Sequence, residues 1–147
     1  MLTQITMGRV PAISIRQPWA ELILRGKKTI EIRSWSPDYR GLLWLHAGSR
    51  SDPEVEKSFG FLDLFKGGFV GSVVLSTVVP MDRHRWEVWR TKHLDLGNYR
   101  AGLYAWLLSS PCRFEPPIPG VGRLNLFFPP IELDSLLHQA SSRIQHE

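Results

Sequence analysis

The sequence has little cysteine: Cys112 is the only thiol among its 147 residues. A disulfide within the chain is therefore excluded, and so is a metal site built from several thiolates. A chain of this length buries roughly two thirds of the surface of its unfolded state, so it needs no cross-link to fold. We expect Cys112, which lies between Pro111 and Arg113, to be an ordinary packed thiol rather than a reactive one.

Long apolar segments are missing as well. No stretch approaches the roughly 18 apolar residues of a membrane-spanning helix, so we expect no membrane association. Residues 1–10 lack the basic region and apolar core of a secretion signal, and we expect a cytoplasmic protein. Repeats and a glycine-rich phosphate loop are also absent, which argues against a repeat protein and a doubly wound nucleotide-binding sheet. The histidines are too scattered to suggest zinc, so neither a metal ion nor a cofactor is predicted.

Acidic residues are outnumbered by basic ones, 14 to 18, which leaves a net charge of +4. This mild excess favours anionic partners, nucleic acid among them. The basic residues fall in two groups. The first group is Arg16, Arg25, Lys27, Lys28, Arg33 and Arg40. The second group is Arg83, His84, Arg85, Arg90, Lys92 and His93.

The apolar pattern predicts an α+β fold, a small and mostly antiparallel β-barrel with two or three short helices. Helices are expected over residues 19–25 and 51–61, and residues 81–92 form either a short helix or a basic loop. Three prolines place residues 114–120 at a sheet edge or in a loop. Alternating or continuous apolar residues predict about six strands, at residues 12–16, 29–34, 41–47, 69–79, 102–108 and, weakly, 121–128.

A cluster of charges follows the first predicted helix, which ends at Gly26. The next strand presents Glu31 and Arg33 on one face, and Arg16 would join them if the first strand pairs nearby. Lys28 and Arg33 can hold a phosphate, and Glu31 can accept hydrogen bonds from the exocyclic amine of a base. Lys28 and Glu31 can alternatively act as an acid–base pair. From spacing alone, a simple surface ion pair between Glu31 and Arg33 is the commoner arrangement.

The segment from Ile13 to Ala20, followed by G-x-K-x-x-E-x-R over residues 26–33, resembles the opening of ASCH domains. The resemblance covers about residues 11–130, which leaves residues 1–10 as a leader and residues 131–147 as a C-terminal helix or tail. Three later segments resemble parts of the same family in the same order, at residues 40–47, 104–108 and 117–124.

The resemblance implies a PUA-like β-barrel whose cleft is lined by Lys28, Glu31 and Arg33. ASCH domains are associated with RNA metabolism and transcriptional coactivation, and some bacterial members hydrolyse N4-acetylcytidine or cleave RNA. In the amidohydrolases a threonine stands at the position of Glu31, and Glu87 is a candidate for their later carboxylate by order alone. This difference favours recognition of RNA or a nucleotide over catalysis.

The leading hypothesis is therefore a protein that binds RNA or a nucleotide, a modified base or single-stranded RNA being the candidate ligands, with DNA open as a partner. The alternative is a hydrolase, a ribonuclease or an N4-acetylcytidine amidohydrolase, with Lys28 and Glu31 as catalytic residues. Trp35 either stacks on a base or caps one end of the barrel. His46 is either a ligand contact or a hydrogen-bonded structural histidine. The candidate binding residues are Arg16, Lys28, Glu31, Arg33, Trp35 and His46.

Overall fold

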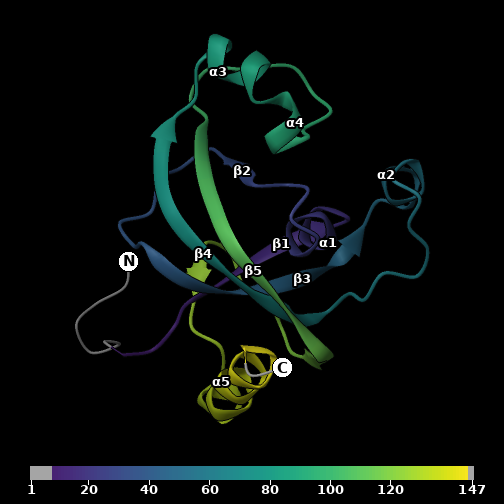
Figure 1. Cartoon of the computed structure of the whole chain (residues 1–147), viewed down its shortest axis with the longest axis vertical. Coiled ribbons are helices and arrows are strands. Elements are labelled where there is room, and N and C mark those ends of the chain that lie inside the picture. The colour runs from purple at the N-terminus through teal and green to yellow at the C-terminus, as the bar shows by residue number, and fades with distance from the viewer. Residues whose placement is uncertain (1–7, 146–147) are drawn as a thin grey trace.

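A curved sheet of six strands carries the fold in the computed structural model, which describes residues 8–145 (Figure 1). The strands lie in the order β2-β5-β4-β3-β1-β6. β1 pairs with β3 in parallel, whereas the other four strand pairs are antiparallel. The strands are β1 (Ala12–Gln17), β2 (Ile30–Arg33), β3 (Gly41–Ser51), β4 (Gly68–Pro80), β5 (Tyr104–Pro119) and β6 (Leu126–Phe127).

Five helices lie around this sheet in the described part of the chain, two more than the upper number predicted. Residues 81–92, predicted as one helix or a loop, form two helices, and the C-terminal segment is helical as well. α3 and α4 lie together at one end of the sheet, and α5 lies at the opposite end (Figure 1). The helices are α1 (Trp19–Leu24), α2 (Pro53–Ser58), α3 (Arg83–Val88), α4 (Arg90–His93) and α5 (Ile131–Gln145).

The predicted α+β, mostly antiparallel barrel is confirmed, but the barrel is only half closed. Strands β2 and β6 lie at the two ends of the sheet order and are not hydrogen-bonded neighbours. Residues 1–7 of the predicted leader and residues 146 and 147 of the predicted C-terminal segment lie outside the described residues.

Three groups of buried side chains hold the elements together. The largest packs the sheet against α1 and includes Ile15 and Trp106. A second group joins α5 to the sheet through Leu137 and Trp44, and a third lies around Trp86 of α3. Trp44, Trp86 and Trp106 are at most 1% exposed, so tryptophan supplies much of the core.

Strand β5 continues through a proline-rich stretch that the sequence predicts as a separate edge strand or loop. β2 pairs with β5 only at residues 104–107, so beyond that point β5 has β4 as its sole hydrogen-bonded neighbour. Prolines at 111, 116 and 117 therefore fit, because one side of the strand needs no N–H donors there. Three register shifts between β4 and β5 bend the pair as it runs.

Gly71 on β4 allows one of these bends. A Cβ atom at this position would lie 2.3 Å from the Cys112 carbonyl oxygen on β5 and 2.5 Å from Leu24 of α1. Real contacts of this kind are essentially never so short, so a side chain would push β5 and α1 away from β4. Glycine is thus required here by close approach.

We predict that Gly71→Ala lowers the free energy of unfolding by at least about 1–3 kcal/mol, the usual cost of overpacking a tight site. Urea denaturation measures the loss. Gly48→Ala on β3 is the matched control, because its new Cβ would meet only the Ser14 hydroxyl, at 3.4 Å. Equal losses in the two variants would contradict the close-approach explanation.

Candidate nucleic-acid interface

The charged segment at residues 26–33 begins where α1 ends. Gly26 has a φ angle of 73°, the left-handed conformation expected for a glycine at a helix end. The backbone N–H groups of Lys27 and Lys28 both donate to the Leu22 carbonyl, each at 3.0 Å. This turn leaves Lys27 exposed and directs Lys28 into the protein.

Lys28 is buried, with only 3% of the residue exposed. Its ammonium nitrogen lies 3.5 Å from the Glu31 carboxylate, donates to the His93 carbonyl oxygen, and lies 5.3 Å from the centre of a Trp19 ring. Burial lowers the pKa of Lys28, and the attraction of Glu31 opposes that shift. Lys28 is therefore placed to position Glu31 rather than to reach a ligand at the surface.

Glu31 and Arg33 continue the same network across the sheet. Glu31, 8% exposed, accepts a hydrogen bond from Nε of Arg33 at 3.0 Å. Nη2 of Arg33 donates to the Ser14 carbonyl on β1, also at 3.0 Å. Arg16 is exposed on β1, and the ion-pair partners of Glu31 among the described residues are Lys28 and Arg33. The network is largely covered, and Arg33, with 26% of its side chain exposed, is its accessible member.

His46 is buried at 2% exposure and makes hydrogen bonds with both ring nitrogens. Nε2 lies 2.8 Å from the Gly120 carbonyl, which can only accept, so Nε2 carries the proton. Nδ1 then accepts from the Ser14 hydroxyl at 2.9 Å. A Cβ on Gly122 would lie 2.6 Å from the His46 ring, so the loop at residues 120–125 packs directly on it. His46 is thus covered by this loop and hydrogen-bonded through both ring nitrogens.

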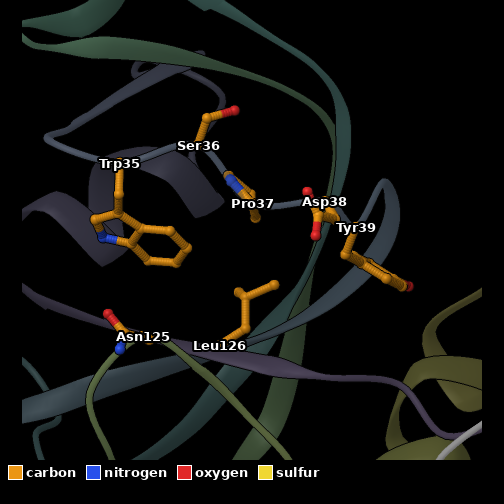
Figure 2. Close-up of a pocket in the computed structure, with 7 residues that line it drawn as sticks. All are labelled: Trp35, Ser36, Pro37, Asp38, Tyr39, Asn125 and Leu126. Carbon is orange, nitrogen blue, oxygen red and sulfur yellow. The ribbon is translucent and has the colours of Figure 1, made fainter. Parts of the chain in front are cut away.

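A pocket of about 550 Å³ lies beside this network (Figure 2). One wall is the loop between β2 and β3, and the other is the start of β6, so two segments about 90 residues apart face each other. The volume falls within the range usual for sites that bind small ligands. The lining residues are Trp35, Ser36, Pro37, Asp38, Tyr39, Asn125 and Leu126.

Trp35 was the predicted stacking residue, and the structure places it in the wall of this pocket. Its ring packs edge-on against Trp106, with ring centres 4.8 Å apart and planes at 87°. The Trp106 indole N–H also donates to the Trp35 carbonyl at 3.1 Å. Trp35 is half-buried, so its position is fixed by the core while part of its ring remains accessible.

The rest of the pocket is also held in place by specific contacts. Arg40 donates from Nη1 to the carbonyl oxygens of Pro37 and Tyr39, at 2.7 and 2.9 Å. The Tyr39 hydroxyl donates to the Leu42 carbonyl at 2.7 Å. Asn125 has a φ angle of 61°, a left-handed conformation that asparagine tolerates better than most residues. These contacts preorganise both walls before any ligand arrives.

Among the pocket-lining residues, the sequence singled out Trp35 as a candidate. Asn125 and Leu126 were missed, because they reach the pocket only when β6 pairs antiparallel with β1. A left-handed asparagine before a short strand leaves no distinctive signal in a single sequence.

The other candidate catalytic carboxylate does not line the pocket. Glu87, the candidate later carboxylate, is exposed on α3 and pairs with Arg90 at 2.8 Å. Within the described residues, no three His, Cys, Asp or Glu side chains come together as metal ligands would. No helix between residues 8 and 145 has the length and apolar character needed to cross a membrane.

Comparison with known proteins agrees with this architecture. The sequence profile of the ASCH domain matches residues 13–118. The chain belongs to the ASCH domain family. Activating signal cointegrator 1 of Mus musculus is 26% identical over 140 residues, and that of Homo sapiens is 25% identical. Each alignment covers 89% of this chain but 23% of the relative, so this ASCH chain spans about a quarter of those proteins.

Solved ASCH structures share the fold. The crystal structure of ASCH from Zymomonas mobilis matches with a TM-score of 0.64 and 18% identity, covering 89% of this chain and 94% of that one. A mutant of the same protein gives 0.64 and 18%, with 97% of that chain covered. These structural similarities confirm the predicted PUA-like fold, while the family rests on the profile match.

We predict that the free energy of unfolding falls as the pH drops from 7 to 5, partly through His46. Burial lowers the pKa of His46, so below about 6.5 the unfolded chain binds a proton that the folded protein does not. His93 behaves in the same way, and each histidine contributes at most about 1.4 kcal/mol per pH unit.

The variant His46→Gln keeps a donor and an acceptor but does not titrate, so its stability should fall less between pH 7 and 5. Urea denaturation at several pH values measures the slope. His84→Gln, the same substitution at an exposed histidine, is the control. An unchanged slope in His46→Gln would contradict a neutral, buried His46.

Proposed function

We propose that this ASCH domain binds RNA and holds one unstacked base in the pocket beside Trp35. The observation that carries the proposal is a half-buried indole fixed in the wall of a preformed pocket of about 550 Å³. Every base has a flat π face, and stacking on an aromatic side chain contributes about 1–3 kcal/mol per base. Such a pocket selects single-stranded RNA, because bases in a duplex are already stacked and paired.

Exposed arginines around the pocket suit the phosphates on either side of that base. Arg33 is partly exposed at the end of β2, and Arg40 is exposed on the loop that forms one wall. Arg123 is exposed two residues before Asn125 of the other wall. Guanidinium groups bind phosphate oxygens well and without regard to sequence. The same contacts would accept single-stranded DNA, since none of them requires the 2′-hydroxyl group.

The geometry does not favour the hydrolase alternative. Catalysis by Lys28 and Glu31 would require both groups to touch a substrate, yet they are 3% and 8% exposed. Lys28 is further committed to the His93 carbonyl, and Glu31 to Arg33. Their arrangement supports a structural role beneath the binding surface.

We predict that Trp35→Ala weakens binding of a short single-stranded RNA about 5- to 150-fold, which corresponds to one lost base stack. Trp35→Phe should retain most of the affinity, because phenylalanine also offers an aromatic face. Fluorescence anisotropy of a labelled oligonucleotide measures both, with circular dichroism as a check on folding.

The matched control is Trp89→Ala, which removes a half-buried indole that lies outside the pocket, between α3 and α4. Its effect should be small. If Trp35→Ala and Trp89→Ala weaken binding equally, or if wild type binds no RNA at low salt, the proposed function is wrong.

We also predict that Arg123→Gln reduces the slope of log affinity against log salt concentration by about 0.7, the value for one phosphate contact to a single strand. Arg50→Gln, which removes an exposed charge near the end of β3, should leave the slope unchanged. Titrations at several salt concentrations give the slopes, and equal slopes for Arg123→Gln and wild type would place the phosphates elsewhere.

A further inference from the structure

The pocket beside Trp35 has an acidic lining, although the protein has an excess of basic residues. Asp38 is the one charged residue among the seven that line it. A phosphate placed inside would be repelled by this carboxylate, so the pocket suits a neutral or positively charged group. The cationic side chains lie outside the lining, where the phosphates of an RNA chain would run.

The Asp38 carboxylate also lacks a cationic partner in the part of the chain that the structure describes. Neither of the two arginines nearest to it in sequence donates to it. Arg33 donates to Glu31 and to the Ser14 carbonyl. Arg40 donates to the carbonyls of Pro37 and Tyr39 rather than to Asp38. The carboxylate is thus available to accept hydrogen bonds from a ligand.

Trp35 and Asp38 belong to the same loop and lie at opposite sides of the pocket. Figure 2 shows the Trp35 indole and the Asn125 amide on one side and the Asp38 carboxylate on the other, with Pro37 and Leu126 between them. Among aromatic side chains, indole attracts a cation most strongly through the face of its ring. The side chains of Pro37 and Leu126 add an apolar surface that the ring of a base could contact.

An indole face and a carboxylate without an ion-pair partner both attract a positively charged ligand. We propose that the pocket prefers a base carrying a positive charge, such as a purine methylated at N7; this inference rests on the proposed binding of RNA. The charged ring of 7-methylguanine stacks on Trp35. Its N1–H and amino group donate to the Asp38 carboxylate, and the Asn125 amide offers a donor to the remaining carbonyl oxygen.

The test compares two short oligouridines that differ in one central residue, guanosine or 7-methylguanosine. Binding is measured by fluorescence anisotropy slightly below neutral pH, where the methylated base keeps its charge. We expect the wild-type protein to bind the methylated RNA at least about threefold more tightly, as a cation–π contact with partial desolvation implies. In Asp38→Asn, which keeps the size of the side chain, we expect this ratio to fall toward one.

Asp63→Asn is the matched control, because it removes an equal charge from an exposed residue that lines a different hollow. Asp63 has a φ angle of 55°, which asparagine also adopts, so the substitution should not disturb the loop. Both variants raise the net charge equally, so the general electrostatic gain in RNA affinity should be the same in each. The ratio of the affinities for the two RNAs therefore reports on the pocket and not on the overall charge. It should change in Asp38→Asn alone.

A wild-type ratio below about threefold, or a ratio that persists in Asp38→Asn, overturns the inference. If RNA binding still depends on Trp35 in that case, the proposed function stands without it. If RNA does not bind, or binds independently of Trp35, the proposed function fails and the inference fails with it. Displacement of the RNA by a trimethyllysine peptide but not by free 7-methylguanosine would assign the pocket to protein cations and would also overturn the inference.

Discussion

The Glu31 carboxylate joins parts of the chain that the sequence keeps apart. Lys28 approaches it from the turn after α1, and Arg33 binds it while also donating to the Ser14 carbonyl on β1. A carboxylate this deeply buried is stable only when such partners replace water. The network therefore ties β2 to β1, and the loop that continues from β2 is held over the edge of the sheet.

Both walls of the pocket depend on β1 for their position. One wall follows β2, which the arginine contact anchors to β1. The other wall begins β6, where Leu126 pairs with Ile13 of β1. His46 supports the approach to β6 by holding the Gly120 carbonyl and filling the space beside Gly122. The pocket thus lies where two distant segments pair with or are anchored to one strand, and contacts within the protein set its shape.

The charged residues of this domain discussed above fall into a buried group and an exposed group. Lys28 and Glu31, the most suggestive pair in the sequence, are covered and hold the scaffold together. Arg40 and Arg123 are exposed, as the proposed contacts with phosphate require. This division favours recognition over catalysis, because proton transfer to a substrate needs an acid and a base that can reach it. Asp38 then supplies the single charge inside the pocket, where it would set the preference for a base.

Local patterns in the sequence determined most of the fold. Alternation at Ile13 and Ile15 predicts β1, Gly26 predicts the end of α1, and the ordered family segments predict the PUA-like sheet. Trp35 follows Arg33 by two residues, and this spacing singled it out as a candidate from the sequence. The burial of Lys28 and the arrival of Asn125 at the pocket were decided only by tertiary structure. Burial depends on α4 covering the turn, and the pocket depends on pairing across more than a hundred residues between β1 and β6, so neither leaves a local pattern to detect.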